Sequence, residues 1–197
     1  EMRENNIPEW FIESCKKISY LFPRAHAVAY VMMAFRIAWF KVYHPLAFYA
    51  AYFSIRAKAF DLRIMTGDLK TQMTEFNRIK ALDRAASPKD KDLMSALEVS
   101  MEMYQRGYRF INVDIQHSEA RRFSIKDGAL LPPFLAIDSL GETVADAIVA
   151  EREERPFTSL KDLQRRCKVS NTIIDLMKEL KCCGELPEDE QMSLFGA

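Results

Sequence analysis

The sequence predicts a mainly α-helical protein with a small antiparallel β element. Three observations predict this fold class. Long apolar and amphipathic segments at helical spacing fill residues 24–106, the apolar period changes to alternation near 111–125, and short helical segments return after residue 134. The expected layout is a helical segment over 1–106, a β-hairpin element over 107–131, a helical module over 132–186 and a flexible tail over 187–197.

Composition limits the function classes. The chain has 197 residues, 49% of them hydrophobic, which is enough for one or two packed domains. Because Lys plus Arg and Asp plus Glu each number 28, the net charge is zero and any nucleic-acid binding must be local. The four cysteines contain no Cys-x-x-Cys spacing, so we expect no disulfide framework, no zinc site and a reducing cytoplasm: Cys15, Cys167, Cys182 and Cys183.

The most apolar stretch runs from residue 28 to 55. Arg36, Lys41 and the pair His44-Pro45 interrupt it, so we expect no membrane span. The chain starts at Glu1 without a methionine, which favours a piece of a longer protein.

The first module is expected to begin with a buried helix over 24–41, which His44-Pro45 ends. A second apolar helix over 46–58 is expected to pack against it. Further helices are expected over 65–81 and after Ser87-Pro88, where serine is a cap and proline takes the first helical position. Gly107 ends the last of them.

The β element is predicted from alternation. Ile111, Val113 and Ile115 alternate, and Phe123 and Ile125 alternate ahead of the dipeptide Asp127-Gly128, a strong hairpin turn. The segment Leu131–Phe134 contains two prolines and marks the next boundary.

Residues 134–152 resemble a helix-hairpin-helix, a motif that presents main-chain N–H groups at a helix N-terminus to a DNA phosphate. Two residues depart from the motif, because Ser139 stands where glycine is usual and Glu142 brings a negative charge to the phosphate position. A plain helical packing unit with a glycine turn is the alternative. The candidate DNA-binding residues of this turn are Ser139, Leu140, Gly141 and Thr143.

A second, degenerate hairpin copy is expected over 169–180, with Ser170 as the N-cap and no hairpin glycine. A basic cluster lies between the two copies and is interpreted as an added phosphate contact, with a solvated surface as the alternative. Its members are Lys161, Arg165, Arg166 and Lys168.

The tail follows Gly184, which is expected to close the last helix. A short acidic tail cannot bury Met192, Leu194 and Phe195 against itself, so an external apolar pocket is expected. These side chains belong to the pentapeptide Gln191, Met192, Ser193, Leu194 and Phe195. This pentapeptide resembles the one by which bacterial replication proteins dock on the sliding clamp. The alternative is that the tail folds back onto its own domain.

The segments 22–30, 36–45 and 48–53 look like the stretch that follows the catalytic palm in bacterial family C DNA polymerases. Leu131–Phe134 and Gln191–Phe195 match the PolC branch, typical of Gram-positive bacteria, in the same order. The resemblance implies a C-terminal piece of such a polymerase III α subunit: a fingers-type helical segment, a tandem helix-hairpin-helix module and a clamp-binding tail.

The resemblance also implies template-directed addition of deoxynucleotides, with two Mg²⁺ ions held by palm aspartates upstream of Glu1. This piece would then hold no catalytic residue, metal or cofactor and be inactive alone. The implied partners are primer-template duplex DNA, the sliding clamp and the rest of the polymerase, in the cytoplasmic replisome, with no membrane. Arg24, His26 and Tyr30 would lie near the incoming nucleotide, with a core position for His26 and Tyr30 as the alternative.

The same sequence features leave two other function classes open. A non-enzymatic adaptor could use the same hairpin module and clamp peptide without belonging to a polymerase. A metal-free hydrolase is disfavoured, because the histidines at 26, 44 and 117 accompany no recognisable nucleophile motif.

Overall fold

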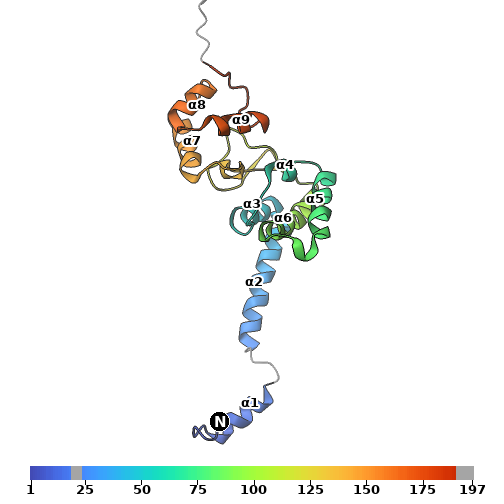
Figure 1. Cartoon of the computed structure of the whole chain (residues 1–197). Helices are drawn as coiled ribbons and strands as arrows, with labels where there is room; N and C mark the ends of the chain where they lie inside the picture. Colours follow the sequence, from blue (N-terminus) through green and yellow to red (C-terminus); the bar gives the residue numbers. More distant parts are fainter. Residues whose placement is uncertain (19–23, 190–197) are drawn as a thin grey trace, which may run out of the picture. The chain divides into compact units, whose positions relative to one another are not determined.

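The computed structural model describes residues 1–18 and 24–189. The chain divides into two compact units, 1–43 and 44–197. The first unit contains α1 (Glu9–Lys17) and α2 (Arg24–Tyr43). The second contains the remaining helices and the sheet (Figure 1).

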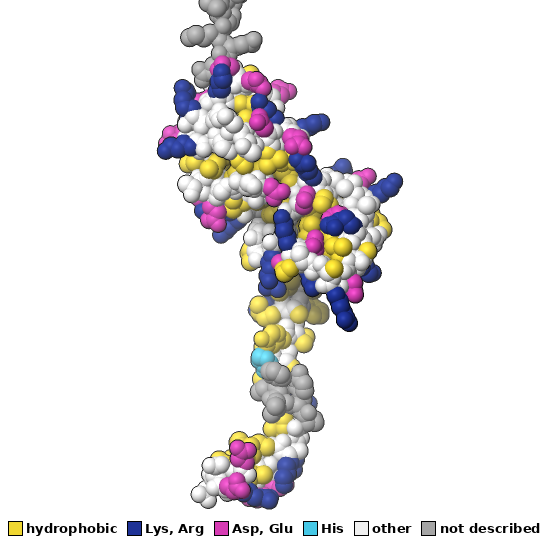
Figure 2. Space-filling view, viewed as in Figure 1, with side chains coloured by type: hydrophobic (Ala, Val, Ile, Leu, Met, Phe, Trp, Pro, Cys, Tyr) yellow, Lys and Arg dark blue, Asp and Glu magenta, His cyan; other side chains and the backbone are white. Residues whose placement is uncertain are grey.

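Helix α2 differs from the sequence expectation. We predicted a buried helix over 24–41, yet none of the described residues of α2 is buried, and Phe35 is 77% exposed. Hydrophobic side chains cover the surface of this helix (Figure 2). The prediction of burial is not met within the first unit, because apolar residues lie all around the helix and the described residues of that unit leave them exposed. The predicted pairing of helices 24–41 and 46–58 involves both units and stays a prediction.

By length and composition alone, α2 could also cross a membrane. The same test is passed by core helices of globular proteins, and one such helix is weak evidence. Arg36 and Lys41 lie within it.

The second unit begins with a helical layer. Helix α3 (Pro45–Ile55) starts at a proline, as predicted. The expected helix 65–81 is two helices, α4 (Leu62–Met65) and α5 (Leu69–Ala81), because the side chain of Asp68 accepts a hydrogen bond from the Thr71 N–H and begins a new helix. A 3₁₀ turn, η1 (Asp83–Ala85), leads to α6.

Helix α6 (Pro88–Gln105) confirms the predicted cap. Ser87 accepts a hydrogen bond from the Asp90 N–H, while the Asp90 carboxylate accepts one from the Ser87 N–H. Helix α6 ends just before Gly107, which has the left-handed φ of +85°, as expected. The helices α3, α5 and α6 share one core cluster, whose largest fully buried members include Tyr49, Met65 and Leu97.

The sheet is smaller than predicted. Strands β1 (Ser124–Lys126) and β2 (Ala129–Leu131) pair antiparallel around Asp127-Gly128, and both turn residues have positive φ, which confirms the hairpin. The alternating segment 111–115 is not a strand in the structure. Its apolar residues Val113 and Ile115 are buried, but the backbone turns at Asp114, whose carboxylate accepts from the Gln116 N–H.

The last part of the unit contains η2 (Phe134–Ala136), α7 (Glu142–Glu154), α8 (Leu160–Cys167) and α9 (Asn171–Glu179). They surround a second core cluster that includes Phe134, Ile148, Leu163 and Met177, all fully buried. The two-proline segment before Phe134 is itself buried, so it is an interior connection and not an exposed linker. Gly184 does not close α9, because the left-handed residue after that helix is Lys181, at φ +56°.

Four phenylalanines pack together in the first cluster, and one of them, Phe60, also packs against the second. Phe53, Phe60, Phe110 and Phe123 lie with ring centroids 4.9 to 6.2 Å apart, mostly edge to face. The helical layer is also tied to the end of α9, because the Asn112 side-chain amide donates to the Leu180 carbonyl. The α7–α9 module is therefore packed against the rest of the second unit.

Candidate nucleic-acid interface

The turn before α7 lies where the sequence predicted it, but the element before it is not the short helix that was expected. The first element of the hairpin is only the 3₁₀ turn η2, and Ser139 occupies the left-handed region at φ +64°. Glycine reaches that region without steric cost, which explains why a hairpin of this kind usually has glycine there. Ser139 keeps the turn at some energetic cost. Leu140 is buried and its N–H donates to the Ile137 carbonyl at 3.2 Å, so this residue offers no free donor to a phosphate, which corrects its assignment as a phosphate contact.

Gly141 lies at the exposed tip of the turn. Its φ of −75° is ordinary, and a Cβ added there would meet no atom within 4 Å. Glycine is therefore not needed for the backbone conformation. The absence of a side chain at this exposed position leaves the start of α7 uncovered by residue 141 itself.

Among the described residues, no side chain caps the N-terminus of α7. Gly141 is its N-cap residue, and the Gly141 carbonyl accepts from the Val144 and Ala145 N–H groups, at 3.1 and 3.0 Å. The exposed residues Glu142 and Thr143 follow, and the first N–H groups of any helix lack intrahelical partners. Such a terminus combines free donors with the positive end of the helix dipole, which suits a phosphate oxygen.

The N-terminus of α8 is occupied. The Ser159 hydroxyl accepts from the Asp162 N–H at 3.0 Å. The carbonyls of Pro187 and Glu188 accept from the N–H groups of Leu160 and Lys161, at 2.9 and 3.2 Å. Residues 187–189 are thus held against α8, which corrects the expectation of a flexible tail from residue 187 onward.

The N-terminus of α9 is capped by Ser170, whose hydroxyl accepts from the Ile173 N–H, as predicted. The turn before it contains Lys168 at φ +55°, so a lysine takes the left-handed position where we noted a missing glycine. Of the three long helices in this module, only α7 presents its first N–H groups without a cap from the described residues.

The basic cluster is divided by the structure. Arg166 is only 11% exposed, and its guanidinium donates to Glu151 Oε2 at 3.0 Å, Asp162 Oδ2 at 3.2 Å and the Arg155 carbonyl at 3.1 Å. It also lies 4.7 Å from the centre of the Phe157 ring. Arg166 is therefore engaged in the fold, which corrects its assignment as a phosphate contact.

The buried carboxylate of Asp162 is the centre of this network. Its side chain has no exposed surface, and it accepts from Arg155, Arg165 and Arg166. Burial raises the pKa of the Asp162 carboxyl, but the hydrogen bonds from Arg165, the Thr158 N–H and Arg166 outweigh burial and hold that pKa below its ordinary value. A buried carboxylate needs such partners.

The remaining cations of the cluster lie at the surface. Lys161 forms an ion pair with Asp189, and Arg165 is 70% exposed while it contacts Asp162. Lys168 is exposed, with no ion pair recorded within residues 1–18 and 24–189. Lys168 is the member of the cluster that is most available to an anion.

Sequence reasoning missed Arg121. This half-exposed arginine, from the loop before β1, contacts the carboxylates of Glu142 and Asp146 on the first turns of α7. It lies 21 residues before Glu142 along the chain, so no local pattern could have linked them. The positive charge of Arg121 therefore partly compensates the negative charge that Glu142 brings to the hairpin.

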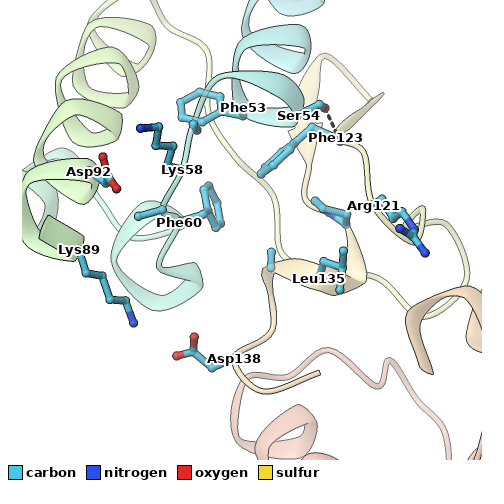
Figure 3. A pocket seen from close by; sticks show the side chains of 14 residues that line it. Phe53, Ser54, Lys58, Phe60, Lys89, Asp92, Arg121, Phe123, Leu135 and Asp138 are labelled. Carbon is cyan, nitrogen blue, oxygen red and sulfur yellow. Dashed lines mark hydrogen bonds between the residues drawn. The ribbon is translucent and has the colours of Figure 1, made fainter. Parts of the chain in front are cut away.

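Arg121 also borders a cleft of about 650 Å³ beneath the phenylalanine cluster. In Figure 3 its guanidinium points away from Phe60 and Lys58. Besides Arg121, which is paired with carboxylates of α7, the cleft contains two lysines, Lys58 and Lys89, whose charges Asp92 and Asp138 offset. It is therefore no basic patch, and the free donors at α7 remain the stronger candidate.

The predicted residues of α2 lie on an exposed helix. Arg24, His26 and Tyr30 are all exposed, and the His26 and Tyr30 rings meet at a centroid distance of 4.5 Å. The alternative that His26 and Tyr30 are core residues is not met within this chain. The clamp peptide, Gln191–Phe195, lies outside the described residues. Among those residues, no group of three or more histidine, cysteine or acidic side chains could hold a metal ion.

Comparisons with known proteins agree with this geometry. Residues 107–191 match a family model described as a helix-hairpin-helix motif. A protein named DNA polymerase III PolC-type from Caldanaerobacter subterraneus subsp. tengcongensis is 48% identical over 195 residues, covering 99% of this chain. Proteins of the same name from Streptococcus pyogenes, serotypes M12 and M1 among them, are 49% identical over 197 residues, covering 98%.

The chain spans only 13 to 14% of the length of these relatives. The match nevertheless covers both units and the hairpin module, in agreement with the resemblance seen in the sequence. Over almost its whole length, this chain is homologous to a segment of DNA polymerase III of the PolC type.

Proposed function

We propose that this chain supplies duplex-DNA backbone binding to a replicative PolC-type polymerase, through the turn before α7. The observation that carries the proposal is the contrast among the three helix N-termini. Protein groups occupy those of α8 and α9, whereas the first turn of α7 has no side-chain cap and an exposed glycine in front of it. Main-chain donors read the phosphate backbone and not base sequence.

The test is a bulky substitution at the turn. Because a Cβ added at exposed position 141 meets no atom within 4 Å, Gly141→Phe is expected to fold normally, with its ring directed to solvent, and to obstruct the phosphate position. Affinity for duplexes of unrelated sequence should fall by a similar factor, on the order of tenfold, which is the loss of about 1.4 kcal/mol. Unchanged affinity in fluorescence anisotropy would favour a module that only packs.

A matched control lies in the second hairpin copy. Ser170→Asp keeps the cap of α9 and adds a negative charge there. If the second copy does not face DNA, the variant should bind duplex DNA as the wild type does, within about twofold at moderate salt. Equal losses in both variants would mean that the two copies share the duplex.

We further propose that residues 191–195 tether the polymerase to the sliding clamp. The support is the pattern Gln-x-Ser-Leu-Phe and the position of its anchor, since residues 187–189 are held on α8 just before it. Leu194→Ala with Phe195→Ala is expected to abolish co-migration with the clamp, while Gly196→Ala should leave it intact. Clamp binding that survives the double substitution would exclude this peptide.

The activity of the whole protein is proposed to be template-directed DNA synthesis in the bacterial cytoplasm. The catalytic aspartates and their Mg²⁺ ions would lie outside this chain, and the rest of the polymerase would cover the apolar surface of α2. A reading frame with paired aspartates upstream of Glu1 supports the enzyme. A short frame without them would favour the adaptor.

Arg24, His26 and Tyr30 are proposed to lie near the incoming nucleotide in that enzyme. Their exposure and the contact between the His26 and Tyr30 rings suit stacking on a base. In the intact polymerase, His26→Ala is expected to raise KM for deoxynucleotides. The exposed Lys70→Ala is a suitable control, and equal KM values for both variants would remove His26 from the nucleotide site.

A further inference from the structure

Two carboxylates lie at the start of α7, and an arginine from the loop before β1 pairs with both of them. Glu142 is the first helical residue of α7 and Asp146 lies one turn later on the same face. Two carboxylates at this place would repel a phosphate, and Glu142 could also occupy the helix terminus in its stead. A DNA-binding turn of this composition needs a compensating cation.

Arg121 meets both carboxylates at once. Its Nε donates to Asp146 Oδ1 at 3.1 Å, its Nη2 contacts Asp146 Oδ2, and its Nη1 contacts Glu142 Oε2. The arrangement is bidentate toward Asp146 and uses the remaining arm for Glu142, which an arginine fork can do and a lysine cannot. The three side chains together carry one net negative charge, compared with two without Arg121.

The loop that carries Arg121 is held independently of this contact. The Phe123 N–H donates to the Ser54 hydroxyl at 2.9 Å, and the Leu135 N–H donates to the Ala120 carbonyl at 3.1 Å. The arginine is therefore presented to α7 from a fixed base. All three charged side chains are about half exposed or more, so the contact adds little to stability.

We propose that Arg121 is a positioning residue for DNA binding: by engaging Glu142 and Asp146 it keeps the N-terminus of α7 open and electrostatically acceptable to a phosphate. The inference rests on the proposed function of the hairpin. It assigns Arg121 to the two carboxylates and not to the phosphate itself.

The test compares duplex affinity in variants of the intact protein. Arg121→Ala restores the second negative charge, and one charge about 7 Å from a phosphate in water is expected to weaken binding on the order of threefold at low salt. The double variant Arg121→Ala with Glu142→Gln has the same net charge as the wild type at this place. It should regain wild-type affinity, and its salt dependence should match that of the wild type.

The single substitution Glu142→Gln tests the same idea with Arg121 still present. It should bind DNA at least as tightly as the wild type, while Glu153→Gln, the same change at the exposed far end of α7, should have no effect. Thermal melting of each variant confirms that the fold persists. Weaker binding by Glu142→Gln would overturn the proposal.

A second result would also overturn it. If the double variant stays as weak as Arg121→Ala and the salt slope falls by about 0.9, Arg121 contacts a phosphate directly. Failure of the hairpin itself is distinguishable, because Gly141→Phe would then bind as the wild type does. A loss with Gly141→Phe but none with Arg121→Ala would reject only the role of Arg121.

Discussion

Asp162→Asn is the substitution whose consequence the structure defines most fully. The Asp162 side chain is completely buried and receives hydrogen bonds from three arginines. Asparagine keeps the shape of the side chain but removes its charge, so the three arginines lose a buried charged acceptor on α8. The Thr158 N–H loses the same charged acceptor.

The magnitude follows from the exposure of the partners. Arg155 and Arg165 are 58% and 70% exposed and can turn to water, whereas Arg166 is 11% exposed and cannot. Breaking a buried ion pair costs about 3–5 kcal/mol, and a charge-assisted hydrogen bond contributes about 1.5–3 kcal/mol. With one buried partner and one retained acceptor, we expect the free energy of unfolding to fall by about 2–3 kcal/mol.

The assay is urea unfolding at pH 7, followed by circular dichroism. Asp175→Asn, at an exposed position of α9, is the matched control and should change the unfolding free energy by less than about 0.5 kcal/mol. A loss below about 0.5 kcal/mol for Asp162→Asn would refute the reasoning, because it would mean that the buried charge contributes nothing net.

The pH dependence of the unfolding free energy tests the same contribution of Asp162. The pKa of Asp162 is lower in the folded chain than its ordinary value, so its contribution to stability is present above about pH 4 and is lost as the pH falls through the folded pKa. The difference in stability between wild type and Asp162→Asn should therefore shrink below about pH 4. A difference that grows on acidification would contradict the assignment.

Three further substitutions, with one control, test local features by thermal unfolding. Ser139→Gly should raise stability by about 0.5–1 kcal/mol, because glycine adopts the left-handed backbone without strain; a decrease would mean that the hydroxyl has an unrecognised role. Gly128→Ala should cost about 1 kcal/mol, since φ is +74° in the hairpin turn, whereas Gly141→Ala should be nearly neutral. Ser100→Ala should cost about 1–3 kcal/mol, because it leaves the buried Gln72 Oε1 without the 2.7 Å hydrogen bond from the Ser100 hydroxyl; no loss would argue for water in its place.

Local signals in the sequence predicted the local structure well. The Ser87-Pro88 cap, the Asp127-Gly128 turn and the Ser170 cap are all confirmed, because each depends on residues within four positions of one another. The same kind of reasoning failed over 111–115, where alternation reflects burial of Val113 and Ile115 and not a strand.

Long-range contacts could not be read from the sequence. Its sequence neighbours suggest that Arg166 is a surface cation, but in the structure it donates hydrogen bonds to Glu151 and Asp162. Arg121 was overlooked because its partners lie on α7. Likewise, α2 was expected to be buried from its apolar residues alone, although burial also needs a partner surface.

The central claim is that the first N–H groups of α7 are kept free for a phosphate, and Gly141→Asp tests it most directly. Aspartate is a good N-cap, and the backbone at position 141 accommodates a side chain, so the variant should be at least as stable as the wild type. Its carboxylate would take the place of the phosphate, so duplex affinity should fall on the order of tenfold. Melting and anisotropy on one preparation should therefore move in opposite directions. A variant that is stabilised and binds duplex DNA as tightly as the wild type would contradict the account.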